Sequence, residues 1–210
     1  MQRIGGLLLF LPVPFVLFLF TRQPLGPWLS LGLGIVLTLS HRLYARPFAL
    51  ARAGRKCLWC GGEAAAGAAD LTLEEPLGRT RWRACPGPHD GSLRRTLGWA
   101  AAHARFLAVG ILGTLAFFLA LAAAVASRRV PGLVEADAVA ALRLGVALTV
   151  LPFGWLAPFR GPRDGPAGRL PFPVHIQALI GTAWVLWLFR LVGLWWLAAG
   201  LGHVAGRLGG

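Results

Sequence analysis

Residues 106–126 read FLAVGILGTLAFFLALAAAVA and decide the class of fold. The stretch holds no charged residue and is long enough to cross a bilayer as a helix, which needs about 20 apolar residues. The whole chain of 210 residues is 56% hydrophobic and only 14% charged, whereas soluble domains carry about 25% charged residues. The sequence therefore predicts an integral membrane protein built from helices.

Four further apolar stretches extend this prediction to an all-α bundle of about five transmembrane helices. They are residues 4–20, 25–44, 138–159 and 174–201. A signal peptide is the alternative for the first stretch, but no small-x-small cleavage site follows it, so we expect a retained helix. Arg143 and Pro152 weaken the fourth stretch. If residues 134–143 form an interfacial helix instead, the remainder is barely long enough to cross.

Arginine residues near the helix ends are distributed unequally between the two sides of the membrane. The side with the N-terminus and residues 46–97 holds most of them. Because positive residues are enriched on the cytoplasmic side, we expect this side in the cytoplasm and the C-terminus outside. The net charge of +13 also favours contact with anionic lipids of the plasma membrane, a bacterial inner membrane, over contact with nucleic acid.

The chain thus divides into helices 1 and 2 (residues 1–45), a polar insertion (46–97) and helices 3 to 5 (98–210). The insertion holds a Cys-x2-Cys pair, Cys57 and Cys60, and a Cys-x3-His pair, Cys85 and His89. Such pairs are typical of tetrahedral zinc. Four protein ligands would make the zinc structural, since catalytic zinc keeps one position open.

The cysteines have three alternative interpretations: a redox pair, a disulfide, or cysteines with no common role. A redox pair needs a βαβ context, which the surrounding sequence does not offer. A disulfide needs an oxidising compartment, whereas the charge distribution places the insertion in the cytoplasm. Zinc also explains how so short an insertion folds, because it has little core of its own.

The sequence between the two pairs alternates in the manner of a β-hairpin. We expect strands near residues 71–74 and 80–84, joined by a turn at residues 76–78. Two metal-binding turns bridged by a hairpin resemble a zinc ribbon, and the resemblance covers about residues 56–89. It departs from the commonest ribbon in that the second pair is Cys-x3-His rather than Cys-x2-Cys.

The return strand carries three alternating arginines, Arg79, Arg81 and Arg83. Alternate residues of a strand share one face, so the sequence predicts a basic face on the hairpin. Lipid phosphates, nucleic acid and an acidic patch of a partner are its candidate ligands. The alternative is a face that is simply solvated near the membrane.

Three histidines, His41, His103 and His175, lie near the same end of three predicted helices. Each falls on a helical stripe with small residues, which favours a position inside the bundle. Neutral imidazoles that converge there would bind haem or a second metal. The alternative is ordinary interfacial histidines bonded to water or backbone.

Two arginines, Arg143 and Arg190, fall within predicted membrane helices. A charge there costs at least about 2.5 kcal/mol and needs a compensating partner. One interpretation is a site for an anionic lipid or a small anion. The other is an arginine bonded to backbone carbonyls, or to a carboxylate of another subunit.

The sequence contains no nucleophile–base signature, phosphate-binding loop or paired intramembrane carboxylates. The leading interpretation is therefore a non-catalytic membrane protein, acting as scaffold, assembly factor or accessory subunit of a membrane complex. A transporter or enzyme that handles an anionic lipid or small anion through Arg143 and Arg190 is the alternative. A haem-binding electron carrier is the third.

Overall fold

The computed structural model describes residues 36, 39–76, 78–175 and 177–209. The predicted helix at residues 4–20 lies outside the described residues, as does most of the one at residues 25–44. Where the continuous description begins, a π-helical turn, η1 (His41–Ala45), runs into α4 (Arg46–Leu50).

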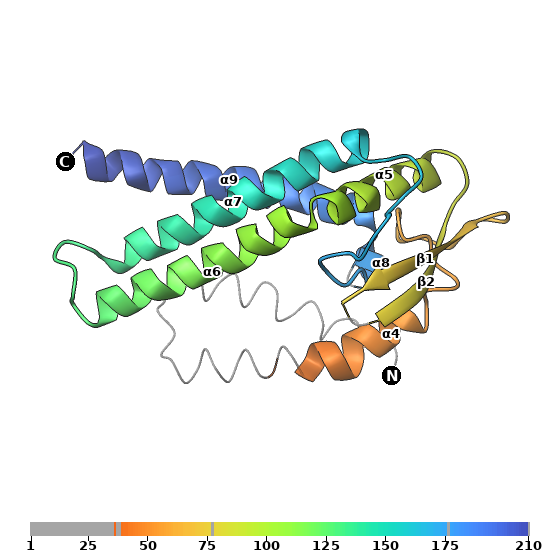
Figure 1. The fold of residues 1–210 in the computed structure, drawn as a ribbon, viewed down its shortest axis with the longest axis horizontal. Helices are drawn as coiled ribbons and strands as arrows, with labels where there is room; N and C mark the ends of the chain where they lie inside the picture. The colour runs from red at the N-terminus through yellow and green to blue at the C-terminus, as the bar shows by residue number, and fades with distance from the viewer. Residues whose placement is uncertain (1–35, 37–38, 77, 176, 210) are drawn as a thin grey trace.

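Three long apolar helices dominate the described part of the chain (Figure 1). They are α6 (Ala104–Ala126), α7 (Glu135–Arg160) and α9 (Thr182–Leu208). Each is long and apolar enough to cross a membrane, with mean hydropathy of 2.4, 1.7 and 1.6 over its most apolar stretch. Of the five predicted transmembrane helices, the described residues thus support three.

The structure decides one alternative and corrects one boundary. α7 is a single helix from its first residue to its last, so residues 134–143 do not form a separate interfacial helix. The last helix begins at Thr182 rather than at residue 174. A short helix, α8 (Gln177–Ile180), precedes it, and Gly181 separates the two with a φ of 95°. Such a φ favours glycine and interrupts the helix. The apolar stretch continues across Gly181, so apolarity alone placed the boundary too early.

Small residues let α7 pack closely against both α6 and α9. Gly110 of α6 lies directly against Thr149, and Gly145 of α7 lies directly against Thr114, with no room for a Cβ at either glycine. Gly193 of α9 contacts α7 in the same way. Close approach at small residues is typical of helix pairs in membranes, and these contacts fix the antiparallel register of α6 and α7.

One end of the bundle carries residues 56–89, which we call the metal module. Its hairpin consists of β1 (Ala69–Glu75) and β2 (Gly78–Ala84), paired antiparallel with Leu71 opposite Trp82. The predicted hairpin is confirmed, with each strand longer than expected. Helix α5 (Pro88–Ala102) follows; it runs past residue 97, where we placed the end of the insertion, to a break at His103 before α6.

The metal module and the long helices share one hydrophobic core. Trp82 of β2 and Leu93 of α5 are buried in the same cluster as Phe153 of α7 and Leu186 of α9. The sequence led us to expect an insertion with almost no core of its own. The ends of the three long helices supply the missing apolar surface, so the metal module is continuous with the bundle.

Candidate metal centre

The four predicted ligands come from two separate turns that the hairpin brings together. Cys57 and Cys60 lie in a turn closed by the Gly61 N–H, which donates to the Cys57 carbonyl over 2.8 Å. Cys85 directly follows β2, and His89 lies in the first turn of α5. Gly61 and the α5 N-cap residue Gly87 have φ values of 75° and 76°, which glycine adopts without steric cost.

The ligand atoms of Cys57, Cys60, Cys85 and His89, which we call the Cys3His cluster, all lie within 4.8 Å of one another. A tetrahedral ion with thiolates at about 2.3 Å would place the sulfurs about 3.8 Å apart, so the spacing fits one ion. All three cysteines are free thiols. The His89 Nδ1 is buried and takes no hydrogen bond from the described residues, which suits a nitrogen that binds a metal.

Backbone N–H groups favour the thiolate form of one of the three cysteines. Burial raises the pKa of the Cys57 thiol, but the N–H groups of Cys85, Cys60 and Trp59 outweigh it and hold the pKa below its ordinary value. The Cys85 N–H lies 3.3 Å from the Cys57 Sγ. Burial raises the pKa of the Cys60 thiol, and the Gly62 N–H offsets this only in part. Because metals bind the thiolate, Cys57 is the better prepared ligand.

The cluster is joined to the N-terminus of α9 by backbone hydrogen bonds. The Thr182 and Ala183 N–H groups donate to the Leu58 and Trp59 carbonyls over 2.8 and 3.0 Å. The Thr182 hydroxyl donates to the Leu58 carbonyl as well, over 2.9 Å. The first N–H groups of a helix have no partner within it, so the turn between Cys57 and Cys60 caps α9. No pattern in the sequence predicted this joint.

A buried carboxylate, Glu75, was also missed. Its Oε1 accepts hydrogen bonds from the Thr80 hydroxyl and from the Trp82 Nε1, the latter over 3.1 Å. Its Oε2 accepts one from the Val174 N–H over 3.1 Å. Arg169 donates to the Glu75 and Pro76 carbonyls. These bonds attach the loop at residues 161–176 to the hairpin, and only the polar character of Glu75 at a strand end hinted at them.

The predicted basic face of the hairpin is largely neutralised by the opposite strand. Arg79 pairs with Glu74 over 2.6 Å, and Arg83 pairs with Asp70 over 3.1 Å. Arg81 lies opposite Thr72 and has no ion pair with the described residues. The Arg79 guanidinium holds the pKa of the Glu74 carboxyl below its usual value.

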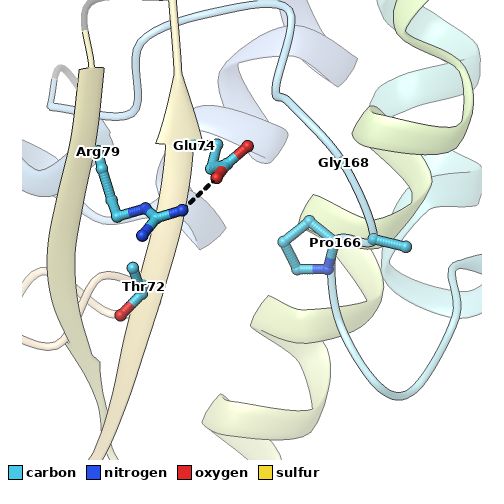
Figure 2. A pocket seen from close by; sticks show the side chains of 6 residues that line it. Thr72, Glu74, Arg79, Pro166 and Gly168 are labelled. Carbon is cyan, nitrogen blue, oxygen red and sulfur yellow. Dashed lines mark hydrogen bonds and ion pairs between the residues drawn. The ribbon is translucent and has the colours of Figure 1, made fainter.

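Figure 2 shows an open pocket beside the Glu74–Arg79 pair, lined on its other side by Pro166 and Gly168 of the loop. Its charged groups already satisfy one another. The pocket and the strand face therefore offer little unpaired positive charge to nucleic acid.

The described residues do not show the three histidines as one cluster. His103 stacks on Trp99 with ring centroids 4.1 Å apart, and its Nδ1 lies 3.0 Å from the Trp99 carbonyl. His175 is buried beside Val174, in the loop that packs on the hairpin. The side chain of His41 lies outside the described residues. Within the described part of the chain, the Cys3His cluster is the only group of three or more His, Cys, Asp or Glu residues that could hold a metal ion. Haem binding by these histidines stays a prediction.

The two membrane arginines lie at different levels and do not form one site. Arg190 donates from its Nε to the Gly154 carbonyl over 2.9 Å. Arg143 is half-buried and makes no hydrogen bond or ion pair with the described residues. It precedes Gly154 on the same helix by about 16 Å of axial rise. One small anion could not contact both side chains at this separation, and anion or lipid binding by either arginine stays a prediction.

The chain matches no protein-family model, no curated protein and no solved structure.

Proposed function

We propose that this chain is a non-catalytic membrane subunit, a scaffold or assembly factor, in which a structural zinc ion fastens the metal module to the membrane helices. The observation that carries the proposal is the joint at Leu58 and Trp59, whose carbonyls accept the first N–H groups of α9. An ion held by Cys57 and Cys60 on one side and His89 on the other would tie α9 to α5, and through α5 to α6. Four protein ligands complete a tetrahedron, which favours structural zinc over catalytic zinc.

A matched pair of histidine variants tests the zinc. Elemental analysis of the purified chain should give about one zinc per chain, and His89→Asn should lose it. His103→Asn is the control, because His103 lies outside the cluster, and it should keep the metal. Acidification should also release the ion, since thiolates and imidazole must be deprotonated to bind it. Equal zinc content in both variants would remove the basis of the proposal.

Arg143 supports the assignment as a subunit of a larger complex. The contact of Gly145 with Thr114 places Arg143 about level with Ala116, near the middle of α6 (Ala104–Ala126). A charge at this depth pairs with an acidic or polar partner. The eight acidic residues of the chain are Glu63, Asp70, Glu74, Glu75, Asp90, Glu135, Asp137 and Asp164.

None of these carboxylates is available at that depth. Asp137 is bound to His203 and Arg207 at the end of α9, over 2.7 and 2.9 Å. Glu135 is exposed at the first residue of α7, about 12 Å away from Arg143 along the helix axis. The partner we propose for Arg143 is a carboxylate on a transmembrane helix of another protein.

Native purification in mild detergent tests this partner. Arg143→Leu should lose a membrane protein that wild type retains, and the matched variant Arg129→Leu, in the loop between α6 and α7, should keep it. Mass spectrometry should identify an Asp or Glu within a transmembrane helix of that protein. Exchanging the charges, with Arg143→Asp here and Arg at the partner's acidic position, should restore the complex. Retention by Arg143→Leu would show that the charge is satisfied in another way.

A further inference from the structure

The Arg190 side chain is fixed at its Nε by a carbonyl that α7 cannot satisfy itself. In an α-helix the Gly154 carbonyl would accept the N–H four residues later, but that residue is Pro158, which has none. The Arg190 Nε takes this place over 2.9 Å. Gly154 also leaves room for the stem, since a Cβ there would lie 3.3 Å from the Arg190 Cγ. Pro158 leaves the carbonyl free and Gly154 leaves the space, so this position holds one nitrogen of the guanidinium.

Two tryptophans hold the rest of the guanidinium. The Arg190 Cζ lies 4.7 Å from the ring centroid of Trp155 and 4.8 Å from that of Trp187. Both tryptophan residues are about half-exposed, at 46% and 52%, so the guanidinium lies at the outer surface of the α7–α9 pair. With the described residues, Nη1 and Nη2 of Arg190 make no hydrogen bond. Two N–H-bearing nitrogens of a rigid fork are therefore left for a ligand.

The level of Arg190 along the helices favours a lipid phosphate as its ligand. Extending the register of Gly110 against Thr149 by about five residues places Gly154, and with it Arg190, beside Arg105 at the start of α6. Arg190 is the ninth residue of α9, which begins at Thr182 and ends at Leu208, so it lies nearer the start of the helix than its middle. Exposed tryptophans and arginines at this level are typical of the membrane–water interface, where lipid phosphates lie.

We propose that Arg190, positioned by Gly154, Trp155 and Trp187, binds the phosphate of an anionic phospholipid in the leaflet on the side of the metal module. Guanidinium forks match phosphate oxygens with two parallel hydrogen bonds. The exposed tryptophan faces flank the site with apolar surface suited to the glycerol and acyl chains of a lipid, which a free inorganic anion lacks. The site is separate from the Cys3His cluster and from Arg143, and it does not depend on the proposed function.

Lipid titration followed by native mass spectrometry tests the site on the full chain. The probe is dioleoyl phosphatidylglycerol added to delipidated protein in mild detergent. Arg190→Gln keeps a side-chain amide that can donate to the Gly154 carbonyl but removes the charge, and it should weaken the tightest lipid binding about tenfold or more. Arg190→Lys should restore it only in part, because an ammonium lacks the planar fork. Arg129→Gln is the matched control and should bind like wild type.

Four further measurements complete the test: zinc content, the unfolding temperature, lipid binding by Pro158→Ala and displacement by inorganic phosphate. Zinc content and the unfolding temperature report whether Arg190→Gln is folded, and Pro158→Ala gives an independent route. An alanine N–H at residue 158 competes for the Gly154 carbonyl, so we expect weaker lipid binding although the arginine is still present. Inorganic phosphate at millimolar concentration should not displace the lipid. Wild-type lipid affinity in folded Arg190→Gln, or efficient displacement by phosphate, would overturn the proposal.

Discussion

Gly61 and Gly181 meet where the metal module joins α9, and each lies too close to the other's backbone for a side chain. A Cβ on Gly61 would lie 2.7 Å from the Ile180 carbonyl carbon, and a Cβ on Gly181 would lie 2.6 Å from the Cys60 carbonyl carbon. Backbone atoms cannot move aside as a flexible side chain can. The hydrogen bonds that cap α9 therefore depend on two glycines far apart in the sequence.

Gly181→Ala should open this joint. The residue has φ 95° and ψ 142°, a region used almost only by glycine, so strain alone should cost about 1–3 kcal/mol before the backbone clash is added. We expect a lower unfolding temperature and faster zinc loss to a chelator. Gly54→Ala is the control, because no atom lies within 4 Å of its Cβ position. Equal behaviour of the two variants would mean that the joint is not tight in solution.

At the scale of single elements, the hairpin was predictable because its signals are local. Alternating polar and apolar residues and a turn containing proline and glycine specify β1 and β2, and the spacing of Cys57 and Cys60 specifies the metal-binding turn. The start of α9 was not predictable in this way. It is determined by Gly181 and by the hydrogen bonds from Thr182 to Leu58. These two residues are far apart in the sequence, so a periodic pattern of apolar residues cannot predict their contact.

Glu75 holds the loop at residues 161–176 to the hairpin, and its carboxylate accepts from three donors. In Glu75→Gln the amide nitrogen replaces an acceptor and faces a donor. Leaving buried donors unpaired costs about 1–3 kcal/mol, so the unfolding temperature should fall. Hydrogen exchange should report the loss at Val174.

The adjacent residue provides the control. Glu74→Gln changes only the exposed pair with Arg79 and should leave stability nearly unchanged, because solvent screens such pairs. That pair contributes only while Glu74 is ionised; its lowered pKa keeps this contribution until the pH falls through the lowered value. If Glu74→Gln destabilised the chain as much as Glu75→Gln, the hydrogen bonds of Glu75 would not be what attaches the loop.

At the scale of the whole molecule, the three long helices and the metal module form one body. The cluster that contains Trp82 and Leu93 continues to Phe153 and Leu186, and the cap on α9 crosses the same boundary. Sequence analysis treated residues 46–97 as a separate unit because polarity changes sharply there. The polarity of a segment indicates whether it is surrounded by water or by lipid. The shared core depends instead on which apolar faces of the module and the helices contact one another.

Three candidate membrane helices, α6, α7 and α9, follow the metal module in the chain. If all three cross, the module and the C-terminus lie on opposite sides, and the arginine distribution leads us to predict that the module lies in the cytoplasm. A protease site inserted at Gly67 should be cut only from the cytoplasmic side, and a fusion at Gly210 should report the outside.

Sites at Gly132 and Gly168 are internal controls; their Cβ positions are also free of contacts. Gly132 should report the outside, because one helix separates it from the module, and Gly168 should report the cytoplasm. If Gly67 and Gly210 reported the same side, one helix would not cross. A change of side between Gly67 and Gly132 without one between Gly132 and Gly168 would identify that helix as α7, whose Arg143 would then need no partner within the membrane.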